Sequence, residues 1–338
     1  MPSNRQILLI SRPKGMPNED NFKMVTNSVP KLKAEGDILV KTIWLSIDPA
    51  LRGRMTGKTT YAEGVELNSV MQAYSLCQVV ESRHNKYKPG DFVFSMFGMQ
   101  DYALANGDAV QEIIPSSVPL QTTLGFYLTG ASAYFGLLEV CKPKKGETAV
   151  VSAAAGSVGS TVGQIARIKG CRVVGITGSD EKVKFLLNEL GYDAAVRYKK
   201  NENLRADLAA ACPSGVDVYF DNTGGDISDA VVPLYNEHAR VCLCGRIANY
   251  NLEGPDIGPR HQPTLIYKRV LMQGYLLIDY MHRYPEAIDQ LTEWVSQGKL
   301  KFQEDIIEGL ENAPKALIGL FEGKNIGKQL VKVAEPDL

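Results

Sequence analysis

The chain has 338 residues, enough for two domains, and 44% hydrophobic and 22% charged residues, as in soluble globular proteins. A formal net charge of −1 excludes a strongly basic surface, so bulk charge predicts no nucleic-acid or anionic-membrane partner. The longest purely aliphatic run near the N-terminus, Ile7 to Ile10, is too short for a signal core or a membrane span. We therefore expect a cytoplasmic protein.

The cysteines predict neither a metal site nor a disulfide framework. The chain has six cysteines without a C-x-x-C pair, and four histidines. The closest pair, Cys242 and Cys244 in RVCLCGR, fits alternate positions on a buried strand. We therefore expect no bound metal.

The first 120 or so residues are predicted to be rich in β-strand. Apolar, β-branched and aromatic runs cover 37–47, 76–82 and 91–97, with Gly, Pro, Asn and Asp between them.

From about Leu124 onward, predicted strands alternate with predicted helices. The strands cover 147–153, 171–177, 194–196, 216–221, 239–245 and 270–277. The first helix runs to Lys169, and the later helices cover 179–190, 202–211, 227–236 and 284–297. Repeated β-α-β units predict a parallel, doubly wound sheet with right-handed crossovers. The last segment, two strands around a helix at about 311–321, is expected to return to the first domain. The expected domains are thus 1–123 with 301–338, and 124–300.

The stretch VVSAAAGSVGSTVGQIA lies between the strand and the helix of the first such unit. Within it, Ala154-x-Gly156-x-x-Gly159 matches the dinucleotide-binding fingerprint, with alanine in the first place. The three small residues permit a tight turn, close approach of a pyrophosphate, and close helix–strand packing. Amides at the helix N-terminus would hold the phosphates. The alternative is a packing turn that binds no ligand.

The end of the second strand, VVGITGSDEK, indicates which dinucleotide binds. Gly178 stands where NAD sites usually carry an acid for the ribose 2′-hydroxyl. Lys182 lies in the first turn of the next helix, where a cation opposes the helix dipole by roughly 0.3–1 kcal/mol and a 2′-phosphate would reverse that sign. A solvated surface lysine is the alternative. The missing acid and the lysine together favour NADPH.

The chain resembles the zinc-independent medium-chain reductases, the group of prostaglandin, alkenal double-bond and curcumin reductases. The resemblance rests on LTGASAYFGLLEVCKPKKGETAVVSAAAGSVGSTVGQIARIKGCRVVG, GSDEKV, YFDNTGG and GKNIGKQLVKV, and LSIDPALRGRM and QDYALANGD also fit. It covers nearly the whole chain and is most specific from 124 to 335. It implies an α/β fold with a GroES-like β-rich substrate domain and a Rossmann-type doubly wound parallel-sheet domain, usually in a homodimer. The implied activity is NADPH-dependent reduction of the C=C bond of α,β-unsaturated aldehydes and ketones.

The resemblance also implies a set of cofactor-binding residues. They are Gly156, Ser157, Val158 and Gly159 of the phosphate turn, Lys182 and Tyr198 at the 2′-phosphate, Asn222, then Cys244, Gly245, Ile247, Tyr250, Tyr275, Leu276 and Leu277 around the nicotinamide, and Asn325 closing over the cofactor. Read from the residues alone, Asn222 could be an Asx-turn residue, Tyr198 could cover a surface strand, and Asn325 could be a turn residue with positive φ.

Tyr250 is the candidate catalytic residue. The stretch MQAYSLCQVV lacks a His–Glu pair, and Cys77 alone cannot hold a metal, so the substrate carbonyl would be polarised by a hydrogen-bond donor. The phenol of Tyr250, in GRIANYN, could donate to the oxygen as an enolate develops, and in the family a tyrosine here lies at the substrate. The α-carbon would take a proton from solvent or from the tyrosine. A structural loop tyrosine is the alternative.

The first domain departs from the family pattern. Ala50 replaces a tyrosine, Met99 replaces a tryptophan, and 72–77 replaces a glycine-rich segment, so we expect a retained cofactor site and a remodelled pocket for a small enone or enal. Tyr61 or Tyr74 could fill that space. An NADPH:quinone reductase and a non-catalytic NADPH-binding protein remain as alternatives.

Overall fold

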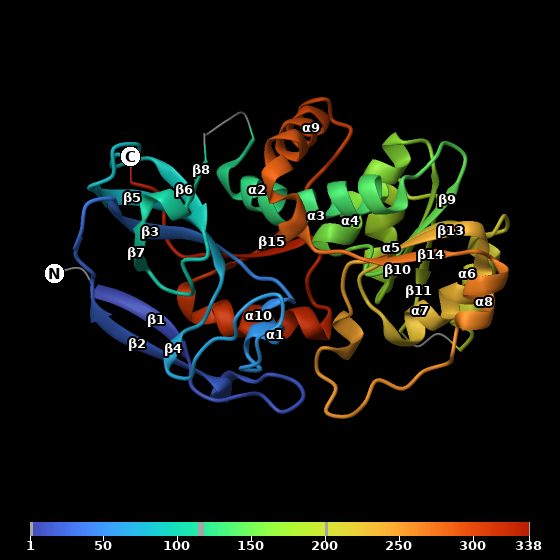
Figure 1. The fold of residues 1–338 in the computed structure, drawn as a ribbon, viewed down its shortest axis with the longest axis horizontal. Helices are drawn as coiled ribbons and strands as arrows, with labels where there is room; N and C mark the ends of the chain where they lie inside the picture. The colour runs from blue at the N-terminus through green and yellow to red at the C-terminus, as the bar shows by residue number, and fades with distance from the viewer. Residues whose placement is uncertain (1–2, 114–117, 200–201, 338) are drawn as a thin grey trace. The chain divides into compact units, whose positions relative to one another are not determined.

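The computed structural model describes residues 3–113, 118–199 and 202–337 and divides the chain into two compact units (Figure 1). Unit 1 comprises Met1–Leu124 and Glu304–Leu338, and unit 2 comprises Gly125–Gln303. The chain therefore leaves unit 1 once and returns to it at its C-terminal end.

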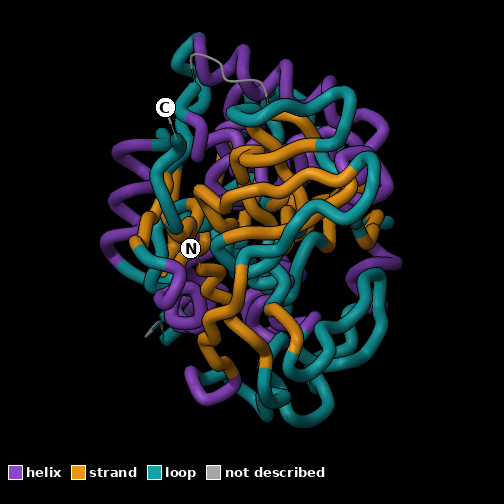
Figure 2. The backbone as a smooth tube through the Cα atoms, turned by 90° about the vertical axis from the view of Figure 1, so that its left-hand side faces the viewer, coloured by secondary structure: helices purple, strands orange, loops and turns teal. Residues whose placement is uncertain are grey.

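Unit 1 is built mainly from strands, which are orange in Figure 2. One sheet follows the order β15-β16-β3-β5-β6-β8, with β7 also paired to β3, and a smaller sheet has the order β2-β1-β4. The bounds are β1 (Ser3–Leu9), β2 (Phe22–Ser28), β3 (Asp37–Ser46), β4 (Ser69–Val70), β5 (Tyr74–Ser82), β6 (Phe92–Ser95), β7 (Tyr102–Asn106), β8 (Gln111–Ile113), β15 (Glu304–Glu308) and β16 (Lys328–Lys332). Helices α1 (Leu51–Arg54) and α10 (Ala313–Glu322) also belong to the unit, and most of α2 (Leu120–Gly125) lies in it.

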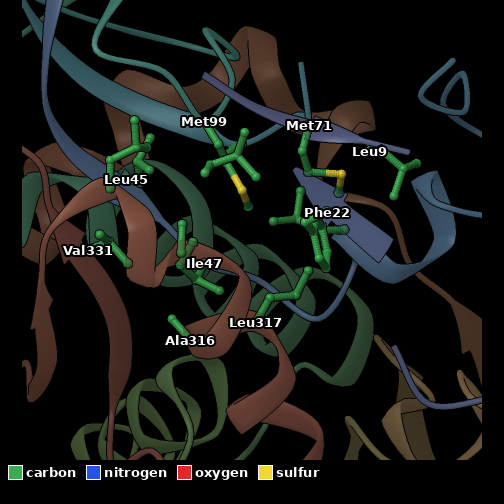
Figure 3. Close-up of a cluster of buried hydrophobic side chains, with 14 of the residues drawn as sticks. Leu9, Phe22, Leu45, Ile47, Met71, Met99, Ala316, Leu317 and Val331 are labelled. Carbon is green, nitrogen blue, oxygen red and sulfur yellow. The ribbon is translucent and has the colours of Figure 1, made fainter. Parts of the chain in front are cut away.

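The core of unit 1 lies where α10 meets the strands. Leu317 of α10 packs in one buried cluster with Leu9, Leu45 and Met71 (Figure 3). Met99 belongs to the same cluster and is fully buried. This departure from the family pattern therefore changes the packing of the core.

Unit 2 contains a six-stranded parallel sheet in the order β11-β10-β9-β12-β13-β14. The strands are β9 (Thr148–Val151), β10 (Arg172–Thr177), β11 (Ala194–Arg197), β12 (Val216–Asp221), β13 (Tyr235–Leu243) and β14 (Leu271–Gly274). The helices are α3 (Ala131–Phe135), α4 (Ser157–Ile168), α5 (Asp180–Lys184), α6 (Leu204–Ala211), α7 (Gly225–Val231), α8 (Gln262–Tyr267) and α9 (Tyr284–Ser296). This confirms the predicted doubly wound sheet. The chain reverses its direction across the sheet between β9 and β12, which is where such folds bind ligands.

Several element boundaries differ from the prediction. The helix predicted over 227–236 ends early, because α7 stops at Val231 and Pro233 lies in a short 3-10 turn before β13. Tyr235 then already pairs with Val216 of β12. The strand predicted over 270–277 is shorter, because β14 ends at Gly274.

A long helix at Leu120–Cys141 was not predicted as an element. It comprises α2 (Leu120–Gly125), α3 and two π-helical segments, Phe126–Gly130 and Gly136–Cys141. By length and composition it is the one helix among the described residues that could cross a membrane, but 72% of its apolar window is buried. A Cβ at Gly136 would lie 2.8 Å from the Phe220 ring, so this helix packs tightly on β12. These are the properties of a core helix.

The ends of β9 and β12 are joined through one buried carboxylate, that of Asp221. Its oxygens accept hydrogen bonds from the hydroxyls of Ser152, Tyr219, Thr223 and Ser228 and from the amides of Thr223 and Gly224. The backbone oxygen of Asp221 also accepts from the amides of Cys244 and Gly245, at 2.9 and 3.0 Å. A buried carboxylate needs this many donors, since its desolvation is otherwise costly. Asp221 therefore ties together two strand ends, the start of α7 and the loop after β13.

We expect Asp221→Ala to lower the free energy of unfolding by about 1–3 kcal/mol, since it leaves buried donors without an acceptor. Asp221→Asn should lose less, because its amide oxygen can still accept at one position. Denaturant midpoints measure both. Asp226→Ala, an exposed acid in the first turn of α7, is the control and should lose less than about 1 kcal/mol. Equal losses at 221 and 226 would show that the network does not stabilise the fold.

Candidate active site

The turn between β9 and α4 is tied closely to the sheet. Ala153 has a left-handed φ of +47°, and its carbonyl accepts from the Gly156 amide at 2.9 Å. The amide of the fully buried Ala154 donates to the carbonyl of Ile176 on β10 at 3.0 Å. The first place of the fingerprint is thus occupied by a residue that anchors the turn to the neighbouring strand.

The two glycines of the fingerprint have different surroundings. A Cβ at Gly159 would lie 2.4 Å from the Ala153 oxygen, a distance that real Cβ atoms do not show. A Cβ at Gly156 would meet only that same oxygen, at 3.2 Å, so its other sides are open. Gly159 therefore allows close packing, and Gly156 allows a ligand to approach the backbone, as the fingerprint predicts.

Helix α4 is held against the sheet by further close contacts. A Cβ at Gly163 would lie 2.0 Å from the hydroxyl oxygen of Tyr192, and that hydroxyl donates to the Gly159 carbonyl at 2.8 Å. The first intrahelical bond of α4 runs from the Ser160 amide to the Gly156 oxygen. The first-turn amides of Ser157, Val158 and Gly159 precede it, at the positive end of a 12-residue helix. This arrangement suits the diphosphate of a dinucleotide.

Tyr198 and Lys199 converge on Gly178 at the end of β10. A Cβ at Gly178 would lie 3.4 Å from Tyr198 Cε1 and 3.5 Å from Lys199 Cε. Burial raises the pKa of the Tyr198 hydroxyl, so this group stays a neutral donor at physiological pH. Tyr198 therefore does more than cover a surface strand, because its ring also lies against Gly178 at the end of β10. Lys199 was missed in the sequence, where its only signal is a lysine directly after a strand-end tyrosine.

Lys182 lies on the helix that follows Gly178. Its amide donates to the Ser179 hydroxyl at 3.3 Å, which makes Ser179 the N-cap of α5. The carboxylate of Asp180 pairs with Arg197 at 2.9 Å, so the nearest acid is neutralised by a cation. Tyr198 and Lys199 thus lie next to Gly178 at the end of β10, and Lys182 lies on the helix that follows.

Asn222 fastens β12 to the end of β9. Its amide donates to the Ser152 hydroxyl, and its side-chain Nδ2 donates to the Ser152 carbonyl, both at 2.8 Å. The Asx-type contacts to Thr223 and Gly224 come from Asp221. Asn222 is therefore a bridge across the point where the sheet reverses.

Tyr250 follows a 3-10 turn, Ile247–Asn249, in the loop after β13. Its hydroxyl oxygen accepts from the Arg246 amide at 3.5 Å and would lie 3.6 Å from a Cβ at Gly245. The Ile247 amide donates to the Asn222 carbonyl at 3.2 Å. The half-buried phenol of Tyr250 thus lies over a loop that is hydrogen-bonded to the end of β12. A phenol that accepts in this way can also donate.

The two neighbouring cysteines are not reactive thiols. A hydrogen bond with Cys141 and burial raise the pKa of Cys242, which lies on β13 as predicted. Burial and the Asp221 charge raise the pKa of Cys244 to about 12, and Cys244 lies one residue beyond the strand. Neither is a thiolate near neutral pH.

Tyr275 lies beside Cys244, at the end of β14. Its amide donates to the Leu243 oxygen at 3.1 Å, and its ring packs on Tyr280 with centroids 5.6 Å apart. The residue is only 7% exposed, yet its hydroxyl has no hydrogen-bond partner among the described residues. Leu276 and Leu277 continue from it and are partly exposed. Buried polar groups usually have a partner, so this hydroxyl is an exception among the described residues.

Asn325 belongs to unit 1, whereas the other expected site residues belong to unit 2. Its side chain donates to the Gly327 carbonyl at 2.8 Å. Asn325 itself has no positive φ; Gly327 does, at +79°. Three residues on, the fully buried Lys328 donates to the Ile47 carbonyl and to Asp48, each at 3.0 Å. Sequence reasoning missed this pair, because burial of a lysine has no local signal.

Other candidates in unit 1 have mixed surroundings. Tyr74 stacks on Phe94 with centroids 5.3 Å apart, while Tyr61 and Ala50 are exposed. The buried Cys77 thiol donates to the Thr42 hydroxyl, and burial raises its pKa to about 12.

No group of three or more His, Cys, Asp or Glu that could hold a metal is found within 3–113, 118–199 and 202–337.

Comparisons with known proteins identify the family of the chain. Residues 5–113 match the family described as the N-terminal domain of oxidoreductase, and residues 157–293 match the family described as zinc-binding dehydrogenase. An NADPH-dependent curcumin reductase of Escherichia coli is 41% identical over 99% of this chain and 98% of its own length. A 2-alkenal reductase (NADP(+)-dependent) of Nicotiana tabacum is 41% identical over 98% of both chains.

A solved structure has the same fold along nearly the whole chain. CurA of Vibrio vulnificus in complex with NADPH has a TM-score of 0.92 and 42% identity, and the match covers 98% of this chain and 100% of that one. Together with the matches at both domains, this shows that the chain belongs to the medium-chain dehydrogenase/reductase family of oxidoreductases.

Proposed function

We propose that the protein is an NADPH-dependent reductase of the C=C bond of α,β-unsaturated aldehydes and ketones. The observation that carries the proposal is the turn from Ala153 to Gly159, whose backbone is open at Gly156 and leads into the amides of α4. Relatives named as curcumin and 2-alkenal reductases support the substrate class. When bound, NADPH supplies the hydride that reduces the C=C bond.

The residues present fit this cofactor. The amides of Ser157, Val158 and Gly159 would hold the diphosphate. Lys182 and Tyr198, together with Lys199, would bind the 2′-phosphate beside Gly178, which stands where NAD sites usually carry an acid.

On the nicotinamide side, the proposed contacts come from three loops. Asn222 is one, and the segment from Cys244 through Gly245 and Ile247 to Tyr250 is another. The third is Tyr275, Leu276 and Leu277, where the Tyr275 hydroxyl is buried without a hydrogen-bond partner among the described residues. Asn325 completes the set of cofactor-binding residues proposed from the family resemblance.

Tyr250 would stabilise the charge that develops during the reaction. Reduction adds a hydride to the β-carbon and a proton to the α-carbon, and between these additions the carbonyl oxygen becomes negative. The phenol would donate a hydrogen bond to that oxygen. The Arg246 amide, which donates to the phenol oxygen, would orient it. A preorganised donor of this kind lowers the barrier because it needs no rearrangement.

In this proposal a hydrogen bond, and not a zinc ion, polarises the substrate carbonyl. We also propose that the enzyme acts in the cytoplasm. Cys77 is a buried neutral thiol that hydrogen-bonds to Thr42, which is not the state of a metal ligand. The six cysteines are free and five of them are buried, as suits a reducing compartment.

We also propose a homodimer formed through β14. Within the described part of the chain, this strand pairs with β13 alone, and all four of its residues are exposed. Apolar side chains continue past it at Leu276, Ile278 and Met281. An exposed apolar edge strand is a template for pairing, and a second copy would continue the sheet across a two-fold axis.

Leu271→Asp on β14 is expected to give monomers, because it places a charge in the proposed interface. Sedimentation should give twice the 37.0 kDa of one chain for the wild type. For the variant it should give the mass of a single chain. Leu252→Asp, at a similarly exposed loop residue, should remain dimeric. A wild type that sediments as a monomer would rule out the dimer.

Lys182→Ala should weaken NADPH binding about tenfold or more, because a charge-assisted hydrogen bond to the 2′-phosphate is lost. NADH binding should hardly change. Lys184→Ala, an exposed lysine on the same helix, is the control. Titration calorimetry with both cofactors measures the difference. If NADPH and NADH binding fell equally, Lys182 would not read the 2′-phosphate.

Tyr250→Phe should slow the single-turnover reduction of an enone about 10²- to 10³-fold while the Kd of NADPH is unchanged. Tyr267→Phe, a strongly exposed tyrosine, should leave the rate as it is. NADPH absorbance in rapid-mixing experiments follows both.

The wild-type enzyme should also consume NADPH faster with alkenals and enones than with a benzoquinone. Faster turnover of the quinone would favour a quinone reductase, and no turnover with any of these compounds would favour a binding protein.

An unchanged rate in Tyr250→Phe would remove that residue from the mechanism.

A further inference from the structure

Two hydroxyl groups meet at the N-terminus of α4. The Oγ1 of Thr129 and the Oγ of Ser157 are 2.5 Å apart, and either can be the donor. Thr129 is 8% exposed and lies in the π-helical segment Phe126–Gly130, while Ser157 is the first residue of α4. The contact therefore joins the long core helix to the helix that would bind the diphosphate.

The protons of this pair can be arranged in two ways. Thr129 Oγ1 also lies 3.1 Å from the Gly125 carbonyl, which can only accept. When Thr129 donates there, its one proton is used, and Ser157 must donate to Thr129. When Thr129 instead donates to Ser157, the proton of Ser157 is available for a third group. The two arrangements interconvert when both hydroxyl groups rotate about their C–O bonds.

Local structure does not require this contact. Gly156 is the N-cap of α4, so Ser157 does not cap the helix. Thr129 already has the partner that buried threonines in helices usually use, the carbonyl four residues earlier. A second partner on another helix, at the mouth of the phosphate turn, therefore needs its own explanation.

We propose that the Ser157 side chain is a further donor to the cofactor diphosphate and that Thr129 positions it. This rests on the proposed NADPH site. Phosphate oxygens only accept, so they disfavour the arrangement in which the lone pairs of Ser157 face them. Binding selects the other arrangement, in which Thr129 donates to Ser157 and Ser157 donates to the phosphate. The result is a charge-assisted bond from an oriented hydroxyl.

The test compares Thr129→Val, which keeps the shape and removes the hydroxyl, with Ser157→Ala and with the double variant. Titration calorimetry measures binding of NADP and of adenosine 2′-monophosphate, which lacks the diphosphate. We expect each single variant to bind NADP about three- to tenfold more weakly, and the double variant no more weakly than Ser157→Ala. Binding of adenosine 2′-monophosphate should be unchanged. Thr129→Ser, which restores a hydroxyl, should recover NADP binding.

Ser160→Ala is the matched control. Its hydroxyl is on the same helix and donates to the Ser157 carbonyl at 3.1 Å, so it shares the location but not the proposed role. NADP binding at the wild-type level in Thr129→Val would overturn the proposal, and so would additive losses in the double variant. If the Thr129 and Ser157 variants lost adenosine 2′-monophosphate binding as strongly as NADP binding, the two hydroxyls would have only a structural role. If the wild type bound neither compound, the NADPH site itself would fail, which is a different result.

Discussion

The site depends on a single buried charge, the carboxylate of Asp221. An ion in the interior is tolerated only where donors surround it, and here they come from the end of β9, from β12 itself and from the start of α7. Its backbone oxygen in turn holds the loop after β13, which carries Tyr250. The positions of Asn222 and Tyr250 are therefore set by hydrogen bonds at the ends of buried strands, where the protein is most rigid.

A second constraint is the absence of side-chain atoms where α4 meets the sheet. Gly159 and Gly163 let the helix approach so closely that a methyl group would overlap Ala153 or Tyr192. This approach keeps the first-turn amides beside the strand end and open at Gly156. The same contacts that stabilise the packing therefore expose the amides that we propose bind the diphosphate, so tight packing and the proposed phosphate binding depend on one feature of this turn.

Much of unit 2 could be predicted because its signals are local. Buried parallel strands read as short apolar runs, and the fingerprint and the missing acid at Gly178 are fixed by spacing. The Asp221 bridge to Ser152, the approach of Tyr198 and Lys199 to Gly178, and the Thr129–Ser157 contact could not be predicted, since each joins residues that lie apart in the sequence. The boundary between α7 and β13 was missed because Pro233 and the pairing of Tyr235 act together. Met99 looked like a pocket residue by its sequence position, but its side chain fills the core of unit 1.

The two halves of the proposed chemistry place different demands on the chain. A dinucleotide presents fixed phosphates, and its binding needs backbone amides and glycines at exact positions, which leaves few alternatives for residues 153–159. The proposed substrates share one conjugated carbonyl and differ elsewhere, so one fixed donor, Tyr250, meets the chemical requirement. The remaining contacts can be apolar, and apolar surfaces tolerate changes of shape at modest cost. On this reasoning, we expect the departures at Ala50 and 72–77 to change the fit of a substrate and Met99 to change the packing of the core, while the proposed reaction depends on unit 2.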